Sequence, residues 1–163
     1  MRKGPFFAFS LLAVSLLLVC RTAGAVQAGQ PAPRFALDDT CGRPVSIAAL
    51  KGQVVILNFF AVWCPPCDKE ISILNRLYGK YKSRGVEVLG VTNDTLKEVK
   101  DHEARRPVDY PVLIDTKSTA HILYDVLPIP VTFLIGRDGV IAGKFIGPPD
   151  AKALEGDVVR LLQ

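Results

Sequence analysis

The sequence predicts an α/β fold in which a central mixed sheet is flanked by helices. The first observation is an apolar run over residues 54–60, broken only by Asn58, which is typical of a strand buried on both faces. The second is the alternation of strand-like and helix-like segments after that run. The third is a turn over 137–139 between two apolar segments, which predicts an antiparallel hairpin at one edge of the sheet.

The other strands follow from short apolar segments bounded by turn residues. Two of them precede the central strand around a turn and predict an N-terminal β-hairpin extension. Residues 26–34 contain a glycine and two prolines and are expected to be a linker or an irregular lead-in. The predicted strands are 34–37, 44–47, 54–60, 86–91, 112–114, 131–135 and 140–146.

The helices are predicted from apolar spacing and from caps. Apolar residues recur three or four positions apart over 68–84, and Gly85 supplies a C-terminal stop. Thr95 and Glu98 have the spacing of a capping box, which begins a polar helix that ends before Pro107. Two further helices are expected over 118–126 and 150–162.

The first 25 residues have the features of an export signal. Arg2 and Lys3 are followed by an uncharged, largely apolar stretch over 6–19 and by small residues that fit cleavage after Ala25. That stretch is shorter than the ~20 residues that a membrane span needs. We therefore expect residues 1–25 to be a signal peptide and residues 26–163 to form one domain in the periplasm or another extracytoplasmic compartment.

Two alternatives for this segment stay open, namely an uncleaved membrane anchor and lipidation at Cys20. Val19 stands where a lipoprotein motif has a small residue, which disfavours lipidation. The chain has 20 basic and 16 acidic side chains, and three of the basic ones precede residue 26, so residues 26–163 carry a net charge of +1. This balance does not suggest a nucleic-acid partner.

Three cysteines remain after residue 25, and their odd number excludes a framework of disulfides alone. Two of them form the run Cys64-Pro65-Pro66-Cys67, placed where the buried strand meets a helix. Two intervening residues let the sulfurs close a small ring. The N-terminus of a helix stabilises a thiolate through its free N–H groups and its dipole. The run therefore predicts a redox-active disulfide.

The order of the two cysteines predicts their roles. Cys64 should be the more exposed, attacking thiol, and Cys67, one turn into the helix, the resolving thiol. Pro65 and Pro66 are tolerated in a first helical turn because the N–H groups they lack have no partner there. They also remove donors near the Cys64 sulfur and supply no cation, which favours a reductant over an oxidant.

A structural zinc site and an inert disulfide are the alternatives for this run. Structural zinc needs four ligands, and the chain after residue 25 adds only Cys41, His102 and His121, without a second pair at ligand spacing. Both histidines are expected at the surface or on a helix face, and Cys41 is expected to be a lone thiol in a turn. No metal and no cofactor other than the Cys64–Cys67 disulfide is expected.

The stretch 59–67, with Trp63 directly before Cys64, resembles the active site of the thioredoxin superfamily. More narrowly, it resembles the exported TlpA/ResA-like thiol–disulfide reductases, which carry Asn where Asn58 stands and Glu where Glu70 stands. The resemblance covers roughly residues 31–162. It implies a thioredoxin-like fold, protein thiol or disulfide substrates, including apocytochrome c, and a membrane thiol electron donor.

The same resemblance implies further site residues. Pro130 matches the superfamily's cis-proline, which lies against the two cysteines and presents the backbone of Ile129 to a bound peptide. Asn58 is expected to be a structural hydrogen-bonding residue beneath the site. The residues expected to contact substrate are Trp63, Pro65, Pro66, Ile129 and Pro130.

Glu70 has two interpretations. Lying three residues after Cys67, it could approach the thiols, help to move a proton and raise the thiol pKa values. It could instead be a solvated glutamate on the helix surface. Two other functions on the same fold are weighed: a thiol peroxidase, disfavoured because Ala61 stands where that class has Thr, and a copper carrier, disfavoured because such carriers have wider cysteine spacing and a distal histidine.

Overall fold

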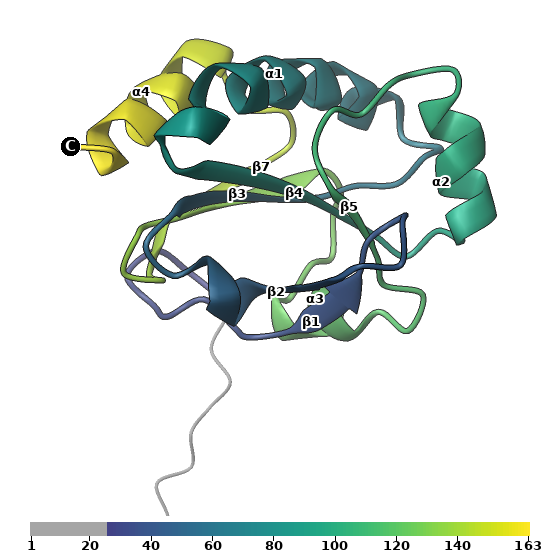
Figure 1. Cartoon of the computed structure of the whole chain (residues 1–163), viewed down its shortest axis with the longest axis horizontal. Helices are drawn as coiled ribbons and strands as arrows, with labels where there is room; N and C mark the ends of the chain where they lie inside the picture. The colour runs from purple at the N-terminus through teal and green to yellow at the C-terminus, as the bar shows by residue number, and fades with distance from the viewer. Residues whose placement is uncertain (1–25) are drawn as a thin grey trace, which may run out of the picture.

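The structure, a computed structural model that describes residues 26–163, is organised around the strand β3 (Val54–Phe59). The predicted signal segment lies outside the described residues. β3 is the middle strand of a five-stranded sheet with the order β5-β4-β3-β6-β7 (Figure 1). β4 and β5 are parallel to β3, β6 is antiparallel to β3, and β7 is antiparallel to β6, so the predicted mixed sheet is confirmed. The other sheet strands are β4 (Val86–Thr92), β5 (Val112–Ile114), β6 (Val131–Ile135) and β7 (Ile141–Ile146).

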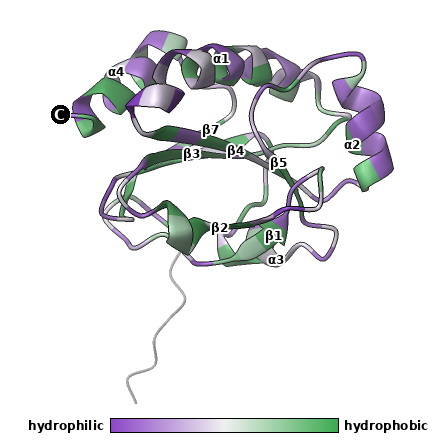
Figure 2. Cartoon of the chain, viewed as in Figure 1, coloured by the Kyte–Doolittle hydropathy of each residue, from purple (hydrophilic) through white to green (hydrophobic). Residues whose placement is uncertain are grey.

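Helices cover one face of this sheet, while a hairpin and a short helix cover the other (Figure 1). α1 (Pro65–Tyr81) and α4 (Ala151–Leu161) lie together on the first face. The hairpin of β1 (Ala36–Asp38) and β2 (Pro44–Ser46) lies with α3 (Thr119–Leu123) on the second. α2 (Leu96–Glu103) lies beside the β5 edge and is mostly hydrophilic, whereas the central strands are apolar (Figure 2).

Alternation along β3 divides the core between the two faces. Val54 and Ile56 pack with the apolar side of α1 and α4, including Leu74. Val55 and Leu57 pack in a second cluster with the hairpin and α3. Because successive side chains of a strand point to opposite faces, apolar residues are needed at consecutive positions to supply both clusters, which explains the apolar run that only Asn58 interrupts.

Both edges of the sheet are covered by backbone contacts. Residues 26–34 follow the β7 edge, where the Gly29 N–H donates to the carbonyl oxygen of Ile141 at 2.8 Å. At the other edge, the Thr40 N–H in the hairpin turn donates to the carbonyl oxygen of Val112 on β5 at 3.0 Å. The lead-in is therefore irregular but not a free linker, and it satisfies strand groups that would otherwise be open to pairing.

Several element boundaries differ from those predicted. The main helix begins at Pro65 rather than residue 68, because the two prolines already have helical geometry in its first turn, and a short 3-10 turn follows it before Gly85, which is left-handed. The helix predicted over 118–126 is only Thr119–Leu123. The capping box of Thr95 and Glu98 is confirmed. Within residues 26–163, none of the helices combines the length and the apolar character that crossing a membrane requires.

Candidate active site

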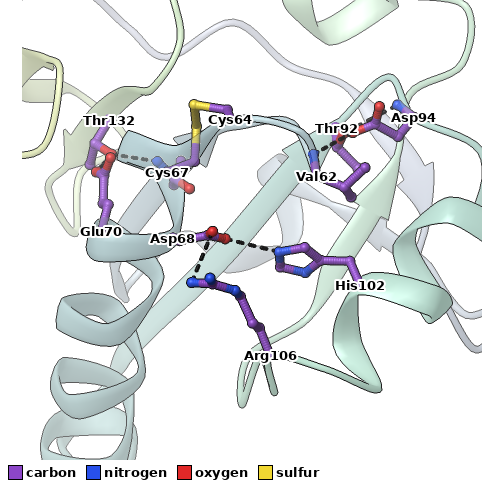
Figure 3. The surroundings of a disulfide bond; sticks show 11 residues. Val62, Cys64, Cys67, Asp68, Glu70, Thr92, Asp94, His102, Arg106 and Thr132 are labelled. Atoms are coloured by element: carbon purple, nitrogen blue, oxygen red, sulfur yellow. Dashed lines mark hydrogen bonds and ion pairs between the residues drawn. A yellow bond between two sulfur atoms is a disulfide. The ribbon is translucent and has the colours of Figure 1, made fainter.

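The two cysteines of the Cys-Pro-Pro-Cys run are joined by a disulfide at the N-terminus of α1 (Figure 3). Cys64 is the N-cap residue in an extended conformation, and the prolines occupy the first helical positions. The Cα atoms of Cys64 and Cys67 are 5.3 Å apart. Cys64 is 5% exposed and Cys67 1% exposed, so the first sulfur is the one nearer to solvent, as expected from their order.

The loop that leads into the disulfide is held by the end of β4. The Val62 N–H donates to Asp94 Oδ2 at 2.8 Å, and the Thr92 hydroxyl donates to the same oxygen at 2.6 Å. The Cys64 N–H closes a turn onto the carbonyl oxygen of Ala61 at 3.2 Å. These contacts fix the approach of the chain to Cys64, and sequence reasoning did not identify Thr92 or Asp94 because they lie about 30 residues away.

A buried hydrogen-bond chain lies beside the second cysteine. Asn58 on β3 and Thr132 on β6 are direct cross-strand partners, and Asn58 Nδ2 donates to the Thr132 hydroxyl at 2.9 Å. Thr132 in turn donates to Glu70 Oε1 from α1. The chain therefore joins three elements directly under the disulfide, and Figure 3 shows the Glu70–Thr132 pair on one side of the two cysteines.

Glu70 is fully buried, so the interpretation of a solvated surface glutamate is wrong. Burial raises the pKa of Glu70 from 4.5 to about 7, although the hydrogen bonds from Thr132 and Asn58 favour its ionised form. Its second oxygen, Oε2, has no hydrogen-bond partner in residues 26–163. Tyr110 is also buried, and burial together with the charge of Glu70 raises the tyrosine pKa. Glu70 is thus a carboxyl group poised to take up or release a proton near neutral pH.

The Ile129–Pro130 peptide bond is cis, as predicted. Ile129 packs against the apolar cluster that contains Cys64 and Cys67, so this loop lies against the disulfide. Trp63, directly before Cys64, is 71% exposed despite its size. The Trp63 side chain is therefore open to solvent directly beside the buried disulfide.

Both histidines lie on helices, which is one of the two expected positions, but they are buried and not at the surface. His102 on α2 contacts Asp68 through Nε2 at 3.0 Å, and Arg106 contacts the other oxygen of Asp68 at 2.9 Å (Figure 3). Asp68 directly follows Cys67, so this cluster joins the first turn of α1 to the end of α2. The partners are about 34 residues apart, which explains why local spacing did not reveal them.

His121 on α3 is buried against a second carboxylate, Asp115. Asp115 accepts hydrogen bonds from three backbone N–H groups at the start of α3 and from His121 Nδ1 at 2.8 Å. Asp115 therefore supplies the side-chain cap of this short helix, because Ser118 at the N-cap position makes no side-chain cap hydrogen bond. The aspartate and histidine are only six residues apart, and this spacing was the one signal that could have indicated the pair.

Cys41 is exposed in the turn between β1 and β2, as predicted, and is not in a disulfide. Asp39 stabilises this turn by accepting from the N–H groups of Cys41 and Arg43. No group of three or more potential metal-ligating side chains occurs within residues 26–163.

The geometry combines the parts that thiol–disulfide exchange requires. The Cys64 sulfur lies at a helix N-terminus, the Cys67 sulfur is bonded to it, and a carboxyl group with a pKa near 7 lies one turn further along the helix. Asn58, Glu70 and Pro130 are all brought to this place, and Thr132 and Tyr110 are additions that the sequence pattern did not indicate.

Comparison with known proteins agrees with this geometry. The AhpC/TSA family model matches residues 28–144. The thiol-disulfide oxidoreductase ResA of Bacillus cereus is 35% identical over 156 residues, covering 88% of this chain and 90% of the relative. ResA of Bacillus subtilis is 38% identical over 124 residues, covering 76% of this chain and 69% of the relative.

Solved structures show the same relationship. A protein from Chlorobium tepidum, assigned as thiol:disulfide interchange protein DsbE, superposes with a TM-score of 0.81 at 33% identity, covering 85% of this chain and 100% of that protein. StoA from Bacillus subtilis superposes with a TM-score of 0.67 at 29% identity, covering 77% of this chain and 96% of that protein. The chain is therefore a thiol–disulfide oxidoreductase similar to ResA and belongs to the AhpC/TSA family of the thioredoxin superfamily.

Proposed function

We propose that this oxidoreductase is exported and reduces disulfides in extracytoplasmic proteins. In the proposed reaction, the Cys64 thiolate attacks a substrate disulfide, forms a mixed disulfide and expels one substrate thiolate. The Cys67 thiolate then attacks the Cys64 sulfur, which releases the second substrate thiol and closes the Cys64–Cys67 disulfide. Two electrons pass to the substrate, and a thiol donor at the membrane restores the dithiol.

The observation that carries the reductive direction is the burial of Glu70 beside Cys67. A carboxylate near the thiols disfavours their ionisation, and a low thiol pKa is what makes the reduced form of strong oxidants stable. The prolines between the cysteines add neither an N–H donor nor a cation, which acts in the same direction. A dithiol whose ionised form is poorly stabilised gives up its electrons more readily.

The proposed location rests on the first 25 residues, whose composition is that of an export signal, and on the requirement for a compartment in which disulfides persist. Reduction of apocytochrome c during cytochrome c maturation is one substrate role in such a compartment, and it is a proposal from family resemblance. In this scheme Trp63, Pro65, Pro66, Ile129 and Pro130 contact the substrate.

Trapping of mixed disulfides tests the roles of the two cysteines and identifies substrates. In the source cell, Cys67→Ser should accumulate mixed disulfides through Cys64, because the resolving thiol is absent. The matched variant Cys64→Ser should trap none and should not reduce insulin. Insulin reduction by Cys64→Ser would overturn the assignment, and a reduction potential near those of strong periplasmic oxidants, about −120 mV, would overturn the direction.

A further inference from the structure

A groove of about 450 Å³ lies between the loops that precede Cys64 and Pro130 and the region of α3. Trp63 and Ile129, the residues before Cys64 and before cis-Pro130, form the end nearest the sulfurs. Ile122 and Leu127 form the far wall and are 74% and 87% exposed. The groove thus has apolar walls open to solvent and is continuous with the place where a substrate disulfide must lie.

Four polar residues also line this groove, namely Asn93, Ser118, His121 and Asp125, and His121 is the buried one among them. Its ring packs edge-on against Phe59, with centroids 5.0 Å apart, and its Nδ1 is held by Asp115. Its Nε2 has no hydrogen-bond partner in residues 26–163, and this nitrogen is not enclosed by the surrounding protein atoms. Nε2 is therefore open to the groove.

The hydrogen bonds of Asp115 determine which nitrogen of His121 carries the proton. Three backbone N–H groups donate to this buried carboxylate, so it acts as an acceptor, and its contact with Nδ1 requires a proton on Nδ1. In a neutral imidazole the other nitrogen is then a hydrogen-bond acceptor. The groove consequently offers an acceptor that Asp115 holds in place beside the apolar walls.

We propose that this groove binds an aromatic side chain with a hydrogen-bond donor, tyrosine above all, located beside the target cysteine of a substrate protein. Such a side chain buries an apolar body against Trp63 and Ile122 and needs a partner for its polar tip, which His121 Nε2 supplies. The occupant is the substrate because Trp63 and Ile129, which directly precede Cys64 and cis-Pro130, line the groove. This inference rests on the proposed function and deepens it by stating a substrate preference.

Peptide turnover tests the preference. The probes are short serine- and glycine-based peptides with one central cysteine, held as a mixed disulfide with thionitrobenzoate. Each peptide carries one tyrosine or one phenylalanine, placed in turn at each position beside the cysteine. With prereduced protein at a pH where imidazole is neutral, kcat/KM should be about fivefold higher for tyrosine than for phenylalanine at one position, the value expected for one hydrogen bond.

The variant His121→Leu should reduce this ratio to one. The ratio compares two peptides on the same sample, so a partly unfolded preparation does not change it. The matched variant Ile122→Ala should lower both rates together and keep the ratio, because it removes only apolar contact. Absence of a tyrosine preference at every position, its persistence in His121→Leu, or unchanged rates in Ile122→Ala would overturn the inference.

A binding measurement separates this inference from the proposed function. The chain contains one tryptophan, Trp63 at the rim of the groove, so its fluorescence reports occupation without turnover. Peptides with serine in place of cysteine should show the same tyrosine preference in this titration. If the preference appears here while no disulfide is reduced, the proposed function fails and the groove assignment stands. If disulfides are reduced but neither measurement shows a tyrosine preference, the groove assignment fails and the proposed function stands.

Discussion

Thr132 on β6 donates a hydrogen bond to the buried carboxyl group of Glu70 on α1. Thr132 lies two residues after the cis-proline Pro130, and Glu70 lies three residues after Cys67. The contact connects the cis-proline strand to the helix that carries the disulfide. It also provides a hydrogen-bond partner for a buried carboxyl group, which would otherwise be costly to enclose. The protonation of Glu70 is therefore linked both to the stability of the fold and to the chemistry of the thiols.

Glu70 should make the protein less stable as the pH rises towards neutrality. Its pKa is raised from 4.5 to about 7 in the folded state, so the unfolded chain releases this proton at a lower pH than the folded protein does. Between these two pH values, rising pH therefore stabilises the unfolded state relative to the folded state. The corresponding loss in the free energy of unfolding is on the order of 3 kcal/mol, complete above the folded pKa. When Glu70→Gln is unfolded in denaturant at pH values across this range, its free energy of unfolding should not show this decline.

The control for this prediction is Glu155→Gln. The pKa of Glu155 is lowered by hydrogen bonds from Lys80 and Tyr81, so its contribution is present above the ordinary carboxyl value and is lost in acid. Its substitution should therefore leave the decline towards neutral pH in place. An undiminished decline in Glu70→Gln would show that another group is responsible.

The Thr132 hydroxyl should be required for stability because it serves two buried partners. Thr132→Val keeps the volume but leaves both Asn58 Nδ2 and Glu70 Oε1 without a hydrogen bond. We expect the free energy of unfolding to fall by about 2–4 kcal/mol, measured in denaturant. Thr132→Ser retains the hydroxyl and should lose less than half as much, and equal losses would mean that the methyl group, not the hydrogen bonds, matters.

The sheet and the disulfide could be predicted because their signals are local. The apolar run of β3, the capping box at Thr95 and the left-handed Gly85 each depend on neighbouring residues in the chain. The Cys64–Cys67 pair and cis-Pro130 were found for the same reason, with the family resemblance added. Such features are determined by spacing and by backbone conformation, which a single sequence contains.

The polar surroundings of the site could not be predicted because they depend on tertiary register. Whether Thr132 faces Glu70 follows from the pairing of β6 with β3, and a shift of one residue would turn it to the opposite face of the sheet. His102 was misplaced for a related reason, since its partner Asp68 lies on another helix. Burial of a polar residue becomes acceptable only when such a distant partner is present.

Asp115 should contribute more to stability than an ordinary helix cap. Its buried carboxylate accepts three backbone N–H groups and the His121 ring, whereas Asp150 at the exposed start of α4 accepts two backbone N–H groups. Asp115→Ala should lower the free energy of unfolding by about 3 kcal/mol and Asp150→Ala by about 1 kcal/mol. Thermal or denaturant unfolding measures both, and similar losses would refute the special role of Asp115.

Glu70 should raise the pKa of the Cys67 thiol. The two residues are three apart on α1, where side chains lie about 5–6 Å from one another at Cβ. Glu70 ionises near pH 7, below the ordinary thiol value of about 8.5, so the thiol loses its proton next to a negative charge. In a Cys64→Ser background, Glu70→Gln should therefore lower the Cys67 pKa by about one unit.

The pH dependence of the alkylation rate of Cys67 measures this effect, with Cys20 and the exposed Cys41 replaced by serine so that only one thiol reacts. Glu155→Gln on α4 is the matched control and should leave the profile unchanged, because it removes a carboxylate paired with Lys80 rather than one beside the sulfur. Glu70→Gln should also remove any inflection near pH 7, since that step belongs to the glutamate. A Cys67 profile that is the same with Glu70 and with glutamine would mean that the carboxylate does not control the thiol, and the structural basis proposed for a reductant would then be lost.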